Sequence, residues 1–420
     1  MSILILHTSN ASRRRHLGRA ARYAKQRGER LILIMENPTW ETEFADRVVA
    51  ADTSDIATTV AAARALLEDE PEPARAVVTF VEHSVPAAAA VAADLGLPFV
   101  GERTARVARD KYAMREAFAA GGVPQPAFGL ARTVDEARTT ARRIGYPLVM
   151  KPLIGGGSMY VRRVDDDGQL AQHFEPIKRR AWDAFGYDPL YESALAEYGG
   201  AILLEAYLPG SEISVESLVV GGETHVVAVH DKPLPMNGPY FEEVCYTTPS
   251  RLPVEVEARV REITAAAHRA VDIRTGATHT EFRIQDGAEP MILETAARLG
   301  GGPVYQSLLL STGVDMVAGL LDLALGEQPD LTAKPEPTPT GFYLFFAGKA
   351  GRIKAIHGVD EANGDPHVRE LALYRSVGDE VDVPPDAGQA HGHVVFTADT
   401  VSGLGDVFDR LVKTIRLETA

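Results

Sequence analysis

Residues 278–302 read Thr-His-Thr-Glu-Phe-Arg-Ile-Gln-Asp-Gly-Ala-Glu-Pro-Met-Ile-Leu-Glu-Thr-Ala-Ala-Arg-Leu-Gly-Gly-Gly, which predicts a two-stranded hairpin. Apolar and polar side chains alternate in the first strand, a polar turn with glycine follows, and the second strand is apolar up to Glu294. The hairpin brings Glu281 and Glu294 to one place, with Arg298 shortly beyond. Hard oxygen ligands of this kind suit a Mg²⁺ ion that holds nucleotide phosphates. Acids that only face water would not explain an apolar strand that runs directly into Glu294.

The chain is long enough for more than one hydrophobic core. Its 420 residues suggest about two to four domains, and 45% hydrophobic with 24% charged residues is typical of a soluble globular enzyme. The sequence has no run of about 18 apolar residues that could span a membrane. The first residues predict a β-strand rather than a secretory signal. The single cysteine, Cys245, excludes an intrachain disulfide and suits a reducing compartment. We therefore expect a cytoplasmic protein with no membrane partner.

The charge balance argues against nucleic acid as a partner. The formal net charge is −15, whereas affinity for a phosphate backbone comes from Lys and Arg side chains. Two short basic clusters, Arg13-Arg14-Arg15 and Lys178-Arg179-Arg180, predict solvated faces rather than binding tracts. An anionic small molecule such as ATP stays compatible, because a few cations inside a cleft suffice.

Short apolar strands alternate with helical segments in the first hundred or so residues. The predicted strands are residues 3–6, 31–35, 76–81 and 99–100, and the predicted helices are residues 17–27, 56–68 and 87–95. This rhythm predicts parallel βαβ units in a doubly wound sheet. No Gly-x-Gly-x-x-Gly motif follows the first strand, so we expect the nucleotide to bind elsewhere.

Three further regions follow. A helix is predicted over residues 104–122, before a small α/β unit, and an antiparallel sheet then carries the 278–302 hairpin. The proline-rich segment 334–341 indicates a domain boundary, because each proline fixes the backbone and removes a donor. The expected domains are an N-terminal Rossmann-like domain (1–105), a linker helix with a small subdomain (106–208), a large subdomain with the metal site (209–333) and a C-terminal α+β domain (341–420).

Phosphate ligands are expected around a second apolar strand. Lys151 ends the strand of residues 148–150 and precedes a proline and the run Gly155-Gly156-Gly157-Ser158. Glycines let backbone N–H groups approach phosphates without a Cβ in the way. Three glycines alone suit a flexible turn equally well, but after Lys151 they predict a phosphate lid.

The segment Glu205-Ala206-Tyr207-Leu208 is expected to read an adenine. A flat base offers a donor and an acceptor on one edge, and a short exposed backbone stretch between two domains can pair with both. Glu212, just past the following turn, can accept from ribose hydroxyls, although a surface acid beside a turn is an equal reading of this residue alone.

The order of these motifs resembles the ATP-grasp superfamily over almost the whole chain. The parts that carry the resemblance are Asp110-Lys111, residues 149–152, the glycine run, residues 204–212, and Glu281 and Glu294 with Arg298. Similarity to the L-amino acid ligase branch, the dipeptide synthetases that resemble bacilysin synthetase, rests on residues 230–232, 278–281 and 294–298. The resemblance implies an ATP-grasp fold of the α/β and α+β class, with an N-terminal doubly wound parallel-sheet domain, a two-lobed ATP-binding region and a β-rich C-terminal domain.

The resemblance also implies roles for single residues. ATP would be bound by Lys111, Lys151, Gly156, Gly157, Ser158, Glu205, Ala206, Leu208 and Glu212. Mg²⁺, which Mn²⁺ can replace, would be held by Glu281 and Glu294. The catalytic cations would be Arg298 and Lys151, and the substrates would contact Glu82, His230, Lys232, Arg298, Gly301 and Gly302.

Several of these roles have plainer readings. Glu82 is an acid at the end of a strand, and a histidine such as His230 is often a satisfied structural group. Many ATP-grasp enzymes carry Asn two residues after the second metal glutamate, where this chain has Ala296, so one of two Mg²⁺ ions would be held less fully. The glycines after Arg298 leave room where a ligase selective for a small substrate could place a wall.

The implied activity is that of an ATP-dependent carboxylate-amine ligase, which forms an acyl phosphate and then an amide, releasing ADP and phosphate. Its partners would be small-molecule carboxylates and amines, with amino acids as the expected class, and homodimers are common among such enzymes. Two alternatives are a carboxylase-like ATP-grasp enzyme that uses bicarbonate and a non-catalytic ATP-binding module. A module would need neither paired metal ligands nor Arg298.

Overall fold

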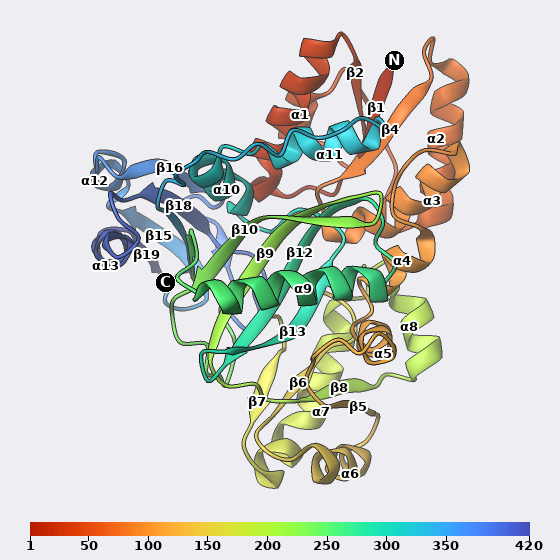
Figure 1. Ribbon diagram of the computed structural model, residues 1–420. Coiled ribbons are helices and arrows are strands. Elements are labelled where there is room, and N and C mark those ends of the chain that lie inside the picture. Colours follow the sequence, from red (N-terminus) through yellow and green to blue (C-terminus); the bar gives the residue numbers. More distant parts are fainter.

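The computed structural model describes residues 1–420 and begins with the predicted parallel sheet (Figure 1). The strands lie in the order β3-β2-β1-β4 and are β1 (Ser2–Leu6), β2 (Arg30–Ile34), β3 (Arg47–Val49) and β4 (Ala74–Thr79). Helix α1 (Arg14–Arg27) packs on one face, and α2 (Ile56–Asp69) with α3 (Val85–Leu95) on the other. The expected doubly wound domain is confirmed.

One predicted strand of this domain is wrong. Residues 99–100 form no strand, and β3 supplies the outer strand instead. Pro98 precedes this dipeptide and lacks a donor for a sheet, and Phe99 packs between two hydrophobic cores.

The predicted helix over residues 104–122 is two helices, α4 (Glu102–Val107) and α5 (Lys111–Ala120). The break lies at Asp110, whose side chain accepts hydrogen bonds from the amides of Tyr112 and Ala113. This capping starts a new helix and places Lys111 at its first position.

The small subdomain is a four-stranded sheet in the order β5-β8-β6-β7. Its strands are β5 (Phe128–Ala131), β6 (Leu148–Lys151), β7 (Arg162–Val164) and β8 (Ile202–Ala206). Its helices are α6 (Val134–Ile144), α7 (Asp167–Ala184) and α8 (Tyr191–Tyr198). Lys151 and Glu205 thus lie at the ends of neighbouring antiparallel strands.

Strands from the second half of the chain form one eight-stranded antiparallel sheet, in the order β13-β12-β9-β10-β11-β14-β18-β16. These strands are β9 (Ser211–Val220), β10 (Glu223–Lys232), β11 (Cys245–Thr248), β12 (Gly276–Gln285), β13 (Glu289–Ala296), β14 (Thr340–Phe345), β16 (Val368–Leu373) and β18 (Gly392–Thr397). Helix α9 (Val254–Ala270) covers one face (Figure 1). Helices α10 (Val304–Thr312) and α11 (Met316–Ala324) lie on the other side, and α11 also packs against the N-terminal sheet.

The sheet changes the meaning of the proline-rich segment. Strand β14 comes after this segment in the chain and pairs with β11, which comes before it, with Cys245 opposite Tyr343. The amides of Lys334 and Thr338 also bond back to the carbonyls of Thr312 and Ser311. Residues 334–341 therefore join two halves of one sheet and do not separate two independent sheets.

The rest of the C-terminal region adds a small three-stranded sheet in the order β17-β15-β19. The strands of this sheet are β15 (Gly351–His357), β17 (Glu380–Val381) and β19 (Arg416–Thr419), and the helices of the region are α12 (Val359–Asn363) and α13 (Gly403–Thr414). No single helix has the length and apolar character to cross a membrane. Only α10 and α11 together meet such a test, and a 102° bend separates them.

Candidate functional site

A cleft lies between the small subdomain and the eight-stranded sheet, and the space within it and at its opening to solvent is about 770 Å³. Strands β6 and β8 with the loop after β6 form one wall, and β12 and β13 form the other. The predicted residues that line it are Lys111, Lys151, Gly156, Gly157, Ser158, Glu205, Ala206, Leu208, Glu212, Glu281 and Glu294. The fold therefore brings the predicted nucleotide and metal residues together in one cavity.

Lys151 is held at the cleft by a buried ion-pair network. Glu205 Oε2 lies 2.6 Å from Lys151 Nζ, and Glu205 Oε1 accepts from Arg115 Nε at 2.6 Å. Burial alone would raise the pKa of Glu205, but Arg115 and then Lys151 outweigh it and lower this pKa to about 2. The side chain of Glu205 thus positions a lysine, and its strand supplies the adjoining backbone.

The hinge after β8 borders an apolar slot. Val149, Tyr207, Met236 and Phe241 pack together there and line the cleft. The amides of Ala206 and Tyr207 donate to protein carbonyls, whereas the amide of Leu208 has no backbone acceptor. An apolar space beside an amide without a backbone acceptor suits a purine ring.

The glycine loop closes against the C-terminal region. Lys111 Nζ donates to the carbonyl of Gly155 at 3.1 Å, which ties the loop to α5. Gly157 has φ +69°, and a Cβ there would lie 2.8 Å from the carbonyl oxygen of Gly388. Only glycine allows this approach without a shift of one loop.

We predict that Gly157→Ala weakens ATP binding. Left-handed backbone costs an L-residue about 1–2 kcal/mol, and the contact with Gly388 adds to this, so the Michaelis constant for ATP should rise by about tenfold. Gly156 lacks a positive φ and has open space at its Cβ, so Gly156→Ala should change it much less. Equal effects of the two variants in an ADP-release assay would contradict this account of the loop.

The two predicted metal ligands face each other as expected. Glu281 on β12 lies directly opposite Glu294 on β13 in the antiparallel register. Glu294 Oε2 is 3.8 Å from Lys111 Nζ, its side chain is 34% exposed, and both carboxylates line the cleft. These acceptors fit a Mg²⁺ ion.

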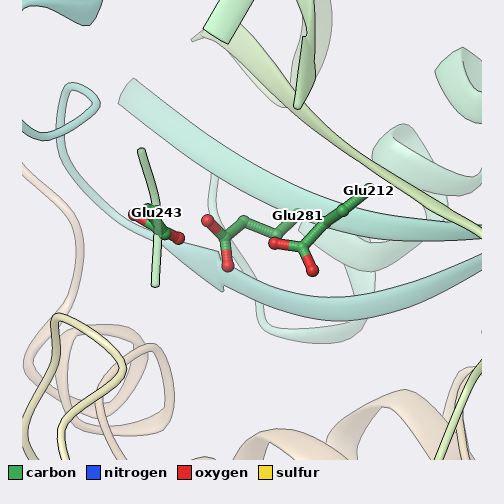
Figure 2. Close-up of side chains that lie close together, drawn as sticks. All are labelled: Glu212, Glu243 and Glu281. Carbon is green, nitrogen blue, oxygen red and sulfur yellow. The ribbon is translucent and has the colours of Figure 1, made fainter. Parts of the chain in front are cut away.

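Lys232 lies among three carboxylates. Its Nζ is 2.6 Å from Glu212 Oε1, 2.7 Å from Glu243 Oε1 and 2.8 Å from Glu281 Oε1. The acidic groups lie side by side in Figure 2, within 4.8 Å of one another. Glu212 also pairs with Arg283 at 2.9 Å. In this conformation Glu212 and Lys232 bond each other. Glu212 still lines the cleft, whereas Lys232 does not.

Glu281 is kept ionised by cations on two sides. Burial would raise its pKa, but Lys232 and His279 hold the pKa well below the ordinary value. His279 Nδ1 bonds Glu216 at 2.5 Å and His279 Nε2 lies 3.3 Å from Glu281 Oε1. Both contacts of Glu281 use Oε1, which leaves Oε2 for a metal ion.

Arg298 is oriented from the N-terminal domain. Glu82 follows β4 and pairs with Arg298, and its other oxygen lies 3.2 Å from Arg109. Burial would raise the pKa of Glu82, but Arg298 and then Arg109 lower it to about 2. Glu82 and Arg298, both predicted at the substrate end, are therefore in direct contact.

Of the remaining predicted substrate residues, His230 is buried away from the cleft, whereas Gly301 and Gly302 are half-buried. His230 is fully buried on β10, bonds Ser307 at 3.2 Å, and its pKa falls to about 4 chiefly because of burial. His230 does not line the cleft, so this placement does not support the substrate contact expected of it. Gly301 and Gly302 lie at the start of α10, half-buried, and the Cβ position of Gly302 is 3.4 Å from Leu344.

Several residues of the site carried no signal in the sequence. Glu243 lies in a loop without strand or helix periodicity, and Arg115 looks like any arginine on a helix. Arg13, expected on a solvated face with its neighbours, is buried at 4% exposure and donates to the carbonyl of Gly300 at 2.7 Å. The prediction for that cluster is wrong at Arg13, because a loop far along the chain covers it.

Two separate segments of the chain match known protein families. Residues 144–305 match the ATP-grasp domain, and residues 343–420 match L-amino acid ligase C-terminal domain 2. The alanine–anticapsin ligase of Bacillus subtilis (strain 168) is 31% identical in an alignment 246 residues long, which covers 56% of this chain and 51% of that protein. The chain thus matches only about half the length of this curated relative.

Solved structures share the fold. An L-amino acid ligase from Bacillus licheniformis matches with a TM-score of 0.83 at 22% identity, covering 100% of this chain and 98% of that chain. The biotin carboxylase domain of the Hydrogenobacter thermophilus 2-oxoglutarate carboxylase matches with a TM-score of 0.71 at 18% identity, over 99% of this chain and 90% of that chain. At such identities the likeness establishes the fold alone. The family matches themselves identify an ATP-grasp domain over residues 144–305 and an L-amino acid ligase C-terminal domain over residues 343–420.

Proposed function

We propose that this protein is an ATP-dependent ligase that joins the carboxylate of one amino acid to the amine of another and releases ADP and phosphate. One observation carries the proposal: the lysines and paired carboxylates of a nucleotide cleft stand in a chain whose C-terminal domain is that of amino acid ligases. The alanine–anticapsin ligase, a relative by sequence, has a name that implies the same kind of reaction.

The first step proposed is transfer of a phosphoryl group. A carboxylate oxygen of the first substrate attacks the γ-phosphorus of ATP, the bond to the bridging oxygen breaks, and ADP leaves. Lys151, Lys111 and Arg298 offset the negative charge that develops on the transferred group. Glu205 keeps Lys151 in place and Glu82 keeps Arg298 in place, so both cations are oriented before ATP binds.

Glu281 and Glu294 would hold Mg²⁺, or Mn²⁺ in its place, which neutralises phosphate charge when bound. The contact of Lys232 with Glu281 supplies a fixed cation beside these carboxylates. Ala296 offers no third side-chain ligand at the end of β13.

The second step proposed is acyl transfer. The neutral amine of the second substrate attacks the carbonyl carbon of the acyl phosphate, the C–O bond to phosphate breaks, and the amine nitrogen loses a proton as the amide forms. Water is the competing nucleophile, and the closed glycine loop supported by Gly388 would exclude it. Glu82 is buried and ionised, and each of its oxygens already bonds an arginine, so an ammonium of the amino acid being activated would share this carboxylate with Arg298 and Arg109.

We expect ADP release to require two amino acids together. The test measures ADP with ATP and Mg²⁺, using each of the twenty amino acids alone and in all pairs, with product masses checked by mass spectrometry. If no product heavier than both substrates forms, the ligase proposal is contradicted. ADP release that depends on bicarbonate would contradict it as well and would favour a carboxylase. ATP binding without any ADP release would favour a binding module.

A further inference from the structure

Arg13 is a buried cation without an anionic partner. It ends the short helix after β1, is 4% exposed and forms no ion pair. The one hydrogen bond of its side chain goes from a terminal nitrogen to the carbonyl of Gly300, and its buried Nε has no partner. A buried charge that lacks a counter-ion is costly, and proteins usually pair it.

The neighbouring buried charges are paired with one another. Arg298 pairs with Glu82, and Arg109 pairs with both Glu82 and Asp188. Glu216 pairs with His279. Arg13 is thus left as one excess positive charge, and burial, then the charge of Arg298, lowers its pKa to about 9.

The position of Arg13 is that of a ligand residue. Strands β1 and β4 are neighbours in the parallel sheet, and Arg13 and Glu82 both follow their carboxyl ends. Ligands of such sheets bind outside these ends. A second nitrogen of Arg13 lies 4.0 Å from the point where a Cβ on Gly301 would stand, so the guanidinium borders the glycines that follow Arg298.

We propose that Arg13 is a specificity-determining residue that binds the carboxylate of the amine substrate. This inference rests on the proposed function and adds a subsite to it. The carboxylate of the first amino acid is consumed in the reaction, whereas that of the second persists into the product. A planar guanidinium suits a carboxylate well, because its parallel N–H groups can donate to both oxygens.

The choice between the two carboxylates follows from the fold. Glu281 and Glu294 line the nucleotide cleft, so the carboxylate that is phosphorylated would lie beside them. Arg298 does not line the cleft, but it is close enough to Glu294 for this carboxylate to help raise the pKa of Arg298 against the effect of burial. Arg13 does not line that cleft and approaches the Arg298 loop from the N-terminal domain. The free carboxylate is therefore the one that this arginine can hold throughout the reaction.

The test compares an acid with its amide. In the most active amino acid pair, Arg13→Gln should raise the Michaelis constant for the amine substrate at least tenfold and leave that for ATP within about twofold. When the same amine substrate is supplied as its C-terminal amide, wild type and Arg13→Gln should agree within about twofold. Arg13→Lys keeps the charge without the fork and should fall between them.

Arg14→Gln is the matched control, since Arg14 belongs to the same basic cluster but pairs with Glu43 on the surface. Equal losses with acid and amide would overturn the inference and leave Arg13 as a support for Gly300. So would a loss confined to ATP.

A binding measurement covers a variant that folds but does not turn over. The thermal midpoint of wild type and Arg13→Gln is recorded with each of the twenty amino acids, with glycinamide and with L-alaninamide. Stabilisation by acids but not amides, lost in Arg13→Gln, supports the subsite even if no amino acid pair releases ADP. Unchanged stabilisation in the variant overturns it.

Discussion

Glu294→Gln is expected to abolish ligation while leaving the fold intact. The amide keeps the shape of the side chain but removes the negative charge that faces Glu281 across the hairpin and lies 3.8 Å from Lys111. Loss of one charged group that stabilises a transition state costs about a hundredfold or more, and a metal ligand also affects ATP binding. ADP release with the best amino acid pair should therefore fall at least a hundredfold.

The control lies on the same strand. Glu289 begins β13, is exposed and forms no ion pair, so Glu289→Gln should keep normal ADP release. Both variants should unfold at the wild-type urea concentration, because Glu294 is partly exposed and has only a distant partner. ADP release by Glu294→Gln at an undiminished rate would refute the assignment of this residue to the metal.

Glu205→Gln is expected to lower the free energy of unfolding by about 3–5 kcal/mol, the effect of breaking a buried ion pair. Glu205 is 2% exposed and its two oxygens bind Arg115 and Lys151, so the amide leaves two cations without their counter-ion. Urea denaturation measures the loss. Glu197→Gln is the control, because Glu197 pairs with Arg106 at the surface and should change stability by about 0.5 kcal/mol or less.

The pH dependence of this effect has a definite sign. The pKa of Glu205 is lowered from 4.5 to about 2 in the folded state, so the folded protein binds fewer protons than the unfolded chain in that window. Its stabilisation is present in full above pH 4.5 and is lost as the pH falls towards 2. The difference between wild type and Glu205→Gln should therefore shrink in acid, and a difference that grows below pH 4.5 would contradict the network.

Local patterns account for most of what could be predicted. The two-strand pattern placed Glu281 and Glu294 on facing strands, but their exact pairing was not predictable from alternation. The register shifts by one residue after the Phe282–Ile292 pair, and this irregularity at Leu293 brings Glu294 opposite Glu281. Strand and helix signals of the N-terminal domain were sufficient to predict its parallel sheet and its three helices, but not strand β3. The strand expected at residues 99–100 failed because two apolar residues after a proline satisfy the pattern without forming a ladder.

Partners far apart in the chain could not be predicted. Arg13 resembles its exposed neighbours in the sequence, and its burial depends on Gly300, almost 290 positions later. Glu243 joins Lys232 from an irregular loop, and the role of Glu205 depends on Arg115 from a separate helix. Charge, burial and distance become informative for such residues only when the fold brings them together.

The eight-stranded sheet bears on how the cleft can open. Because β14, β16 and β18 continue the sheet that carries Glu281 and Glu294, the C-terminal region and these two carboxylates lie on one continuous sheet. The glycine loop belongs to the small subdomain, yet Gly157 packs closely against Gly388 of the C-terminal region. If the small subdomain moves away from the sheet to open the cleft, this contact must break in the same movement. The C-terminal region would then limit how far the glycine loop can close over the cleft.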